Sequence, residues 1–229
     1  MGKAANSSIS LKQIHVTDNF WNKYVHLVKD VIIPYQWDIL NDKLEDVETS
    51  HCIENFKIAA GEKEGEFQGA VFQDTDVAKW LEAVGFVLNY ERDEKLEELA
   101  DETIELIGRA QQPDGYLNLM EGHELYTAGH MIEAAVAYYE ATGKRRFLEI
   151  VSKFADLVCQ TFGSEEGKIH GYPGHQEIEL ALVKLYRVTR EKKYLDLAKY
   201  FIDLRGTGKN YFLEEEKRPG HKRIFPDFV

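Results

Sequence analysis

The sequence contains little cysteine and has no long hydrophobic run. Only Cys52 and Cys159 occur among 229 residues, and they stand 107 positions apart. A disulfide framework is therefore excluded, and so few cysteines are typical of a reducing compartment. No apolar stretch approaches the roughly 18 residues that a membrane-spanning helix needs. Residues 1–10 are polar and lack the apolar centre of a secretory signal, so we expect a soluble, cytoplasmic protein.

Basic residues are scarce relative to acidic ones. The chain has 28 Lys and Arg against 40 Asp and Glu, a net charge of -12. This balance argues against nucleic acid and anionic membrane as partners, because both are bound through clustered Lys and Arg. With 44% hydrophobic residues, the chain is long enough to bury one sizeable core. No low-complexity linker interrupts it, so we predict a single domain over residues 1–229, either an enzyme, a binding domain or a scaffold.

Proline is also rare, with five in the chain, and helical periodicity covers most of it. Apolar residues at helical spacing predict helices over 77–88, 96–107, 131–139, 147–162, 177–188 and 194–204. Glycine and proline mark the linkers at 112–115, 142–144 and 171–174. The predicted fold class is therefore all-α, built from helical hairpins.

The first residues follow a different pattern. Residues 9–16 alternate apolar and polar side chains, which predicts a short N-terminal strand. Thr17 and Asp18 resemble a helix N-cap before a helix over 20–40, and Pro34 should kink or divide that helix.

An internal repeat relates the hairpins. Residues 139–157 match residues 186–204 at an offset of 47, and a weaker copy lies 51 residues upstream. A helical repeat of this length means stacked helix pairs. Such pairs build either an open α-solenoid scaffold or part of a closed α/α toroid, and periodicity alone leaves both open.

Polar residues gather in the linkers between these helices. Asp74, Thr75 or Asp76 is suited to cap the helix that follows them. The same segment, with Gln73 before it and Trp80 one turn later, also has the carboxylate, amide and indole groups that hold sugars.

Two more linkers carry candidate residues. The turn over 111–118 combines amide, acid and phenol groups around Asp114, as a simple turn or a functional one. His123 and His175 each precede a predicted helix, and His130 lies two turns after His123. The histidines lack the tight spacing of a zinc site, so no metal site is predicted, and no pair of carboxylates stands out as acid and nucleophile.

Four ordered motifs resemble glycoside hydrolase family 127, the β-L-arabinofuranosidases. They are residues 71–83, the 111–118 turn, the His-Glu-Leu-Tyr segment at 123–130, and residues 171–186. The resemblance extends over about residues 9–218.

The resemblance implies part of an (α/α)6 toroid whose mouth binds a carbohydrate such as an arabinofuranoside. It implies that His123 and His175 contact the furanose hydroxyls and that Gln73, Asp76 and Trp80 belong to the same pocket. In such a toroid six hairpins close a ring, whereas about three are found here. We therefore expect an incomplete N-terminal portion of the barrel.

The departures from the family concern its catalytic groups. The resemblance implies a general acid/base Glu and a nucleophilic Cys, held as thiolate by zinc, beyond the point where this chain ends. Cys52 and Cys159 stand apart from metal ligands, so no cofactor is expected in this chain, whereas zinc is expected in the full-length family. The segment 119–122 is shorter than usual, and Thr127 stands where the family has a cysteine.

We therefore expect a family 127-like chain that is inactive alone and that associates with itself or with a missing C-terminal half. The alternative is a non-catalytic helical-repeat module that binds carbohydrate or protein. A third possibility is a relative that acts on another sugar, such as an unsaturated uronide, with Asp76 or Asp114 as the acid.

Overall fold

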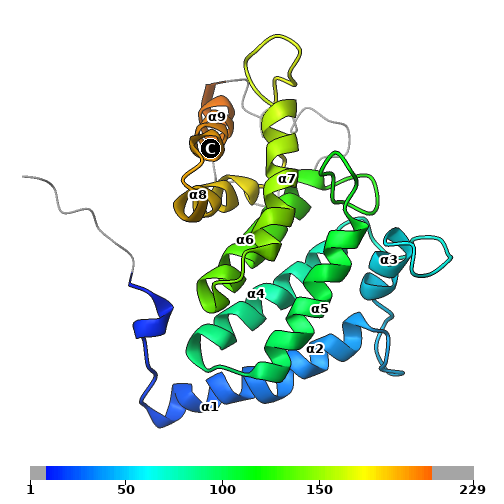
Figure 1. Cartoon of the computed structure of the whole chain (residues 1–229), viewed down its shortest axis with the longest axis vertical. Helices are drawn as coiled ribbons and strands as arrows, with labels where there is room; N and C mark the ends of the chain where they lie inside the picture. Colours follow the sequence, from blue (N-terminus) through cyan, green and yellow to red (C-terminus); the bar gives the residue numbers. More distant parts are fainter. Residues whose placement is uncertain (1–8, 208–229) are drawn as a thin grey trace, which may run out of the picture.

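The computed structural model describes residues 9–207, and its regular elements there are helical (Figure 1). This confirms the all-α fold class. Residues 1–8 and 208–229, which the sequence assigns to the same domain, lie outside the described part. The α-helices are α1 Asn19–Leu27, α2 Ile33–Leu40, α3 Cys52–Ala59, α4 Asp74–Tyr90, α5 Glu94–Ala110, α6 Glu124–Thr142, α7 Arg146–Thr161, α8 Ile178–Thr189 and α9 Lys192–Thr207.

The predicted N-terminal strand over residues 9–16 is wrong. A 3₁₀ turn, Leu11–Gln13, occupies this segment, because the amide of Gln13 bonds to the carbonyl of Ser10 at 2.9 Å. No neighbouring strand is available in the described chain to pair with it, and its apolar side chains lie over α1 and α4 instead. Alternating apolar and polar residues therefore do not form a strand here, because a strand needs a partner to pair with.

The first long helix begins and changes pitch as its sequence requires. Asp18 caps α1 by accepting the amides of Phe20 at 3.0 Å and Trp21 at 2.8 Å. Pro34, at the first turn of α2, cannot donate the i→i−4 bond, and a π-helical turn, Val28–Ile32, precedes it. The helical run nevertheless continues from Asn19 to Leu40, so Pro34 does not divide it, and the predicted kink stays a prediction.

The remaining helices form two layers. The inner layer consists of α4, α6 and α8, which contact one another in chain order. The outer layer consists of α5, α7 and α9, which pack beside them as the returning helices of each hairpin (Figure 1). Because each return helix reverses the chain, α4, α6 and α8 all begin at the same end of the molecule. No helix within residues 9–207 is both long and apolar enough to cross a bilayer.

Small residues let the inner helices approach closely. A Cβ atom on Gly85 of α4 would lie 2.9 Å from the backbone of Ala137 in α6. α6 is buried along almost its whole length, from Thr127 to Tyr138, as the central helix of the stack. Its burial agrees with its largely apolar sequence, in which His130 and Glu133 are polar exceptions on one face.

The 47-residue repeat holds at the level of individual hydrogen bonds. The hydroxyls of Thr142 and Thr189 each donate to the carbonyl four residues earlier at 2.8 Å. Gly143 and Arg190 follow them with φ of 77° and 65°, and each amide bonds to the carbonyl four residues earlier at 2.8 Å. α6 and α8 therefore end with the same left-handed cap.

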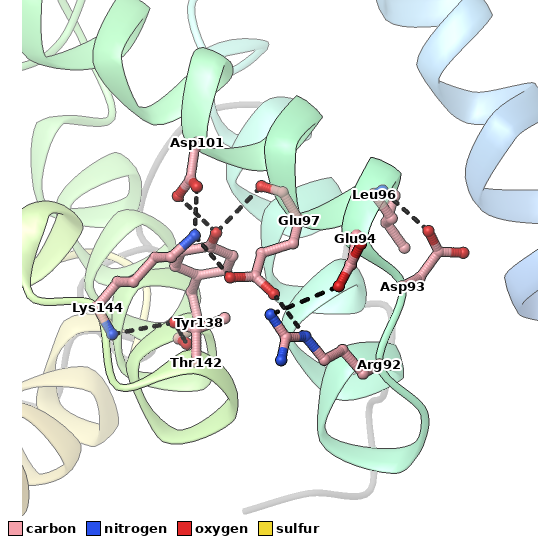
Figure 2. Close-up of polar contacts among 9 residues, drawn as sticks. All are labelled: Arg92, Asp93, Glu94, Leu96, Glu97, Asp101, Tyr138, Thr142 and Lys144. Carbon is pink, nitrogen blue, oxygen red and sulfur yellow. Dashed lines mark hydrogen bonds and ion pairs between the residues drawn. The ribbon is translucent and has the colours of Figure 1, made fainter.

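Polar groups join successive hairpins on the outer layer. Lys144, after α6, pairs with Glu97 and Asp101 of α5, and Tyr138 donates to Asp101 at 2.7 Å (Figure 2). A similar set of side chains joins α7 to α9, where Asp156 of α7 accepts from Tyr194 at 2.7 Å and pairs with Lys193 at 2.6 Å. These contacts fix the register between neighbouring hairpins.

The left-handed caps make a prediction about stability. Arg190 adopts a backbone conformation that costs a residue with a side chain about 1–2 kcal/mol, whereas glycine adopts it freely. Part of that gain is offset by the greater freedom of glycine in the unfolded chain. We expect R190G to raise the free energy of unfolding by about 0.5–1 kcal/mol in urea titrations.

The matched control is G143A at the equivalent position. No atom lies within 4 Å of a Cβ placed there, so the expected loss of about 1 kcal/mol comes from backbone strain alone. If R190G and G143A were both less stable than wild type, the two positions would not form equivalent left-handed caps, which would contradict the prediction.

Candidate functional site

The N-terminal ends of α4, α6 and α8 bring three linkers together. His123 precedes α6, His175 lies before α8, and Phe72 lies before α4. The imidazoles of His123 and His175 are stacked, with ring centroids 5.6 Å apart and planes 26° apart. The ring of Phe72 lies 6.0 Å from that of His123. Residues distant in the chain thus share one aromatic cluster at the N-terminal ends of α4, α6 and α8, the end of the molecule that we call the mouth.

Tyr126 completes this cluster from the first turn of α6. Its ring centroid lies 5.1 Å from that of His175 and 6.1 Å from that of His123. It also meets the ring of His130 edge-on at 4.5 Å. His123 and His130 therefore do not contact each other directly; Tyr126 lies between them. The ammonium of Lys79 lies 5.5 Å from the Tyr126 centroid.

The backbone of His123 is held in a strained conformation. Its φ is 62°, in the left-handed region, while its carbonyl accepts the first helical bond of α6 from Thr127 at 2.8 Å. The imidazole caps no helix amide, although it occupies the N-cap position. Backbone strain of this kind is often found at functional sites.

The short segment 119–122 is fixed by buried side chains. Asn118 donates to the carbonyl of Gly122 at 3.0 Å and to that of Met120, and Glu124 accepts the Gly122 amide at 2.7 Å. Asp74 accepts the amide of Leu119 at 2.7 Å. None of the three expected caps, Asp74 included, binds the start of α4, so that prediction is wrong. Asp74 instead supports the loop before His123.

Burial raises the pKa of Asp74 to about 6, although the Leu119 amide and its hydrogen bond favour the charged form. The side chain is only 2% exposed. The cost of removing this carboxylate from water outweighs the single charge-assisted bond.

Gln73, Asp76 and Trp80 lie at a neighbouring cavity of about 550 Å³ between α2 and α4. Gln73 accepts the amide of Ala70 at 2.6 Å, and Asp76 lies 3.6 Å from the ammonium of Lys79. Trp80 is 2% exposed, and its indole donates to the carbonyl of Ile33 at 3.1 Å. Their predicted role in a sugar pocket stays a prediction.

The 111–118 turn is held by its own residues. Gln111 donates to the carbonyls of Gly115 and Ile150, both at 2.9 Å, and the exposed Asp114 accepts the Tyr116 amide at 2.9 Å. Gly115 has a φ of 97°, and a Cβ there would lie 2.7 Å from the carbonyl oxygen of Lys153. The turn therefore fastens the end of α5 to α7.

Neither cysteine is arranged as a thiolate. Cys52 is buried, its Sγ donates to the carbonyl of Gln73 at 3.2 Å, and burial raises its pKa well above the usual range. Cys159 is half-buried, and burial raises its pKa to about 11. No cluster of metal ligands within residues 9–207 includes either one. The cysteines present therefore do not fit the zinc-held thiolate that the family resemblance implies.

A second polar cluster adjoins the aromatic one through the contact between Tyr126 and His130. The sequence did not predict this cluster. It consists of His130, Glu133 and Glu177, a group of the kind that can hold a metal ion. Burial, together with Lys79, lowers the pKa of His130 to about 4. Burial and the neighbouring Glu133 raise the pKa of Glu177 to about 7. The i,i+3 spacing of His130 and Glu133 was the available signal, but nothing in the sequence pairs them with Glu177.

Asp74 predicts a specific pH dependence of stability. Its pKa is raised from 3.8 to about 6 in the folded chain, so folding favours its protonated form. The contribution of this group is fully present below about pH 4 and is lost as the pH rises through about 6. We expect the stability of D74N relative to wild type to increase by about 2–3 kcal/mol between pH 4 and pH 7.

The measurement is urea unfolding of both proteins across this pH range. The matched control is D114N, because Asp114 makes a similar turn contact but is exposed. Parallel stability curves for D74N and wild type would contradict the assignment.

Comparison with known proteins places this mouth in a family. Residues 13–224 match the family described as "Beta-L-arabinofuranosidase, GH127 catalytic domain". A non-reducing end β-L-arabinofuranosidase of Bifidobacterium longum subsp. longum is 42% identical over 93% of this chain, and the match covers 37% of that protein.

Solved structures agree with the sequence match. A GH127 β-L-arabinofuranosidase from Geobacillus stearothermophilus T6 superposes with a TM-score of 0.83 at 56% identity, covering 92% of this chain and 35% of that one. A second GH127 β-arabinofuranosidase gives a TM-score of 0.80 at 37% identity, over 88% of this chain and 34% of the other.

The helical layers thus correspond to a portion of the GH127 (α/α)6 domain, which decides for the toroid over the solenoid. The chain spans about 35% of the length of these relatives. It belongs to the GH127 β-L-arabinofuranosidase family.

Proposed function

We propose that this chain forms the sugar-contacting N-terminal portion of a GH127 β-L-arabinofuranosidase barrel. The observation that carries the proposal is the stacking of His123 on His175, which unites two of the linkers that carry the family motifs. The relatives from Bifidobacterium longum and Geobacillus stearothermophilus are β-L-arabinofuranosidases, which supports a terminal β-L-arabinofuranosyl group as the ligand.

The chemistry of the mouth suits a furanose. Each imidazole offers one donor and one acceptor to ring hydroxyls, and the Tyr126 face offers an apolar surface to the sugar ring. The left-handed backbone of His123 holds its ring in this position before any ligand arrives. Because little rearrangement is needed, the ordering cost of binding is small.

The chain is proposed to bind but not to hydrolyse the sugar on its own. Retaining hydrolysis needs a nucleophile, and both thiols here have raised pKa values that keep them protonated. In the complete enzyme the Cys nucleophile, its zinc and the general acid/base Glu would come from another portion of the barrel. A cytoplasmic location stays a prediction.

An exposed apolar face on α1 supports a further contact with the rest of such a barrel. Phe20 and Trp21 are each 61% exposed and pack against Tyr24, with ring centroids 5.1–6.2 Å apart. Beside them lies an apolar groove of about 680 Å³ that includes Phe86 and Tyr90. Large apolar patches of this kind mark interaction surfaces.

The first test is calorimetric titration of the purified chain with a β-L-arabinofuranoside, with product measured in the same samples. We expect binding without product. H123A and H175A should each weaken binding about 3–10-fold, the equivalent of one or two hydrogen bonds. H26A, which alters an exposed histidine on α1, should bind like wild type.

Each failure has a separate meaning. Turnover by the isolated chain would overturn the proposed lack of activity. Absence of binding would overturn the sugar-contacting role. Binding that survives H123A and H175A but is lost on removing Asp76 would favour the pocket between α2 and α4, as in the uronide alternative.

The apolar face gives a prediction of its own. We expect the isolated chain to self-associate through this face, and F20S/W21S to shift it toward monomer in sedimentation velocity. F72S, which alters an exposed aromatic residue at the mouth, is the control and should leave the association unchanged. A wild-type chain that is monomeric at high concentration would contradict the prediction.

A further inference from the structure

We propose that His130, Glu133 and Glu177 form a binding site for a divalent transition-metal cation of the zinc type, which ties α6 to the start of α8. The inference concerns residues outside the aromatic cluster and does not rest on the proposed sugar specificity.

The three side chains converge from two elements. His130 and Glu133 are three residues apart on one face of α6, and Glu177 immediately precedes α8. One ligand atom from each lies within 4.8 Å of the others. Nδ1 of His130 lies 3.4 Å from Oε1 of Glu177. To bind one zinc ion at about 2.0–2.2 Å each, the three ligand atoms would have to move slightly closer together.

The second observation is that two of these atoms face each other at 3.4 Å without forming a hydrogen bond. Nδ1 of His130 and Oε1 of Glu177 are both buried, and neither makes a hydrogen bond. A buried polar atom without a partner costs about 1–3 kcal/mol. A cation between them would satisfy both atoms at once, since each presents a lone pair when deprotonated.

The donor set indicates which cation fits. One imidazole nitrogen and two carboxylate oxygens suit zinc and similar borderline ions, with a fourth position left for water. Calcium prefers six to eight oxygen ligands, which this cluster does not supply. The two carboxylates also supply the negative charge that a divalent ion requires.

Lys184 is the group that a metal ion would compete with. Its ammonium contacts Glu133 and lies 4.0 Å from Glu82 of α4. The three residues come from α4, α6 and α8, so Lys184 links all three helices. When a metal ion takes the Glu133 carboxylate, Lys184 retains Glu82 as a partner.

A metal ion at this site would also hold the neighbouring aromatic cluster in place. Glu177 is two residues after His175, and Tyr126 contacts the rings of both His130 and His175. Gly129 allows this approach, because a Cβ there would lie 2.6 Å from Cγ of Glu177. A bound ion would therefore fix the His175 linker against α6.

The test is zinc binding by the chelator-treated full chain, measured by equilibrium dialysis with metal analysis, together with the melting temperature. We expect one zinc ion per chain and a melting temperature that rises with zinc. H130Q and E177Q should each reduce zinc affinity at least about tenfold. K184M, which removes the competing cation, should increase it.

Two controls separate this cluster from other histidines and from the thiols. The double variant H123A/H175A should bind zinc like wild type. Cobalt substitution of the unmodified chain should give visible bands typical of nitrogen and oxygen ligands, with no thiolate-to-cobalt charge-transfer band. This spectrum keeps the test decisive even where a variant fails to fold.

Three outcomes would overturn the proposal. They are no zinc bound by the wild-type chain, a thiolate band with cobalt, and zinc binding that is lost in H123A/H175A but kept in H130Q. The last of these would place the ion between the stacked imidazoles instead.

Discussion

The close approach of the inner helices is the constraint on which the rest of the structure depends. Gly85 brings α4 against the backbone of α6 near Ala137, and Gly129 brings α6 against Glu177 at the start of α8. Larger side chains at these positions would separate the helices and disperse their N-terminal ends. Because the helices pack closely and run in one direction, the linkers that precede them meet at a single mouth.

Two layers of polar chemistry follow from this packing. The aromatic layer, with His123 stacked on His175, lies at the N-terminal ends of α6 and α8. The adjoining layer, with His130 and Glu177, is half-buried and contains two buried atoms that make no hydrogen bond. The outer helices add ion pairs such as Lys144 with Asp101, which hold the hairpins in register without entering the mouth (Figure 2).

Much of this could be predicted from the sequence because it depends on local patterns. Helical periodicity, the Asp18 cap and the repeat that relates Gly143 to Arg190 are set by neighbours in the chain. The motifs around His123 and His175 indicated the family, and their encounter follows from the hairpin topology.

The failures were non-local. The apolar alternation at the N-terminus lacked a partner strand, so it packs on α1 and α4 instead. Asp74 had the composition of a cap but binds the distant Leu119 amide. Glu177 joins His130 only through the contact between α6 and the start of α8.

The most direct test of the account is an NMR titration of the chain with labelled histidine side chains. We expect a nuclear Overhauser contact between His123 and His175, and shifts in those two rings on addition of a β-L-arabinofuranoside. The absence of that contact, or ligand shifts confined to other histidines, would contradict the account.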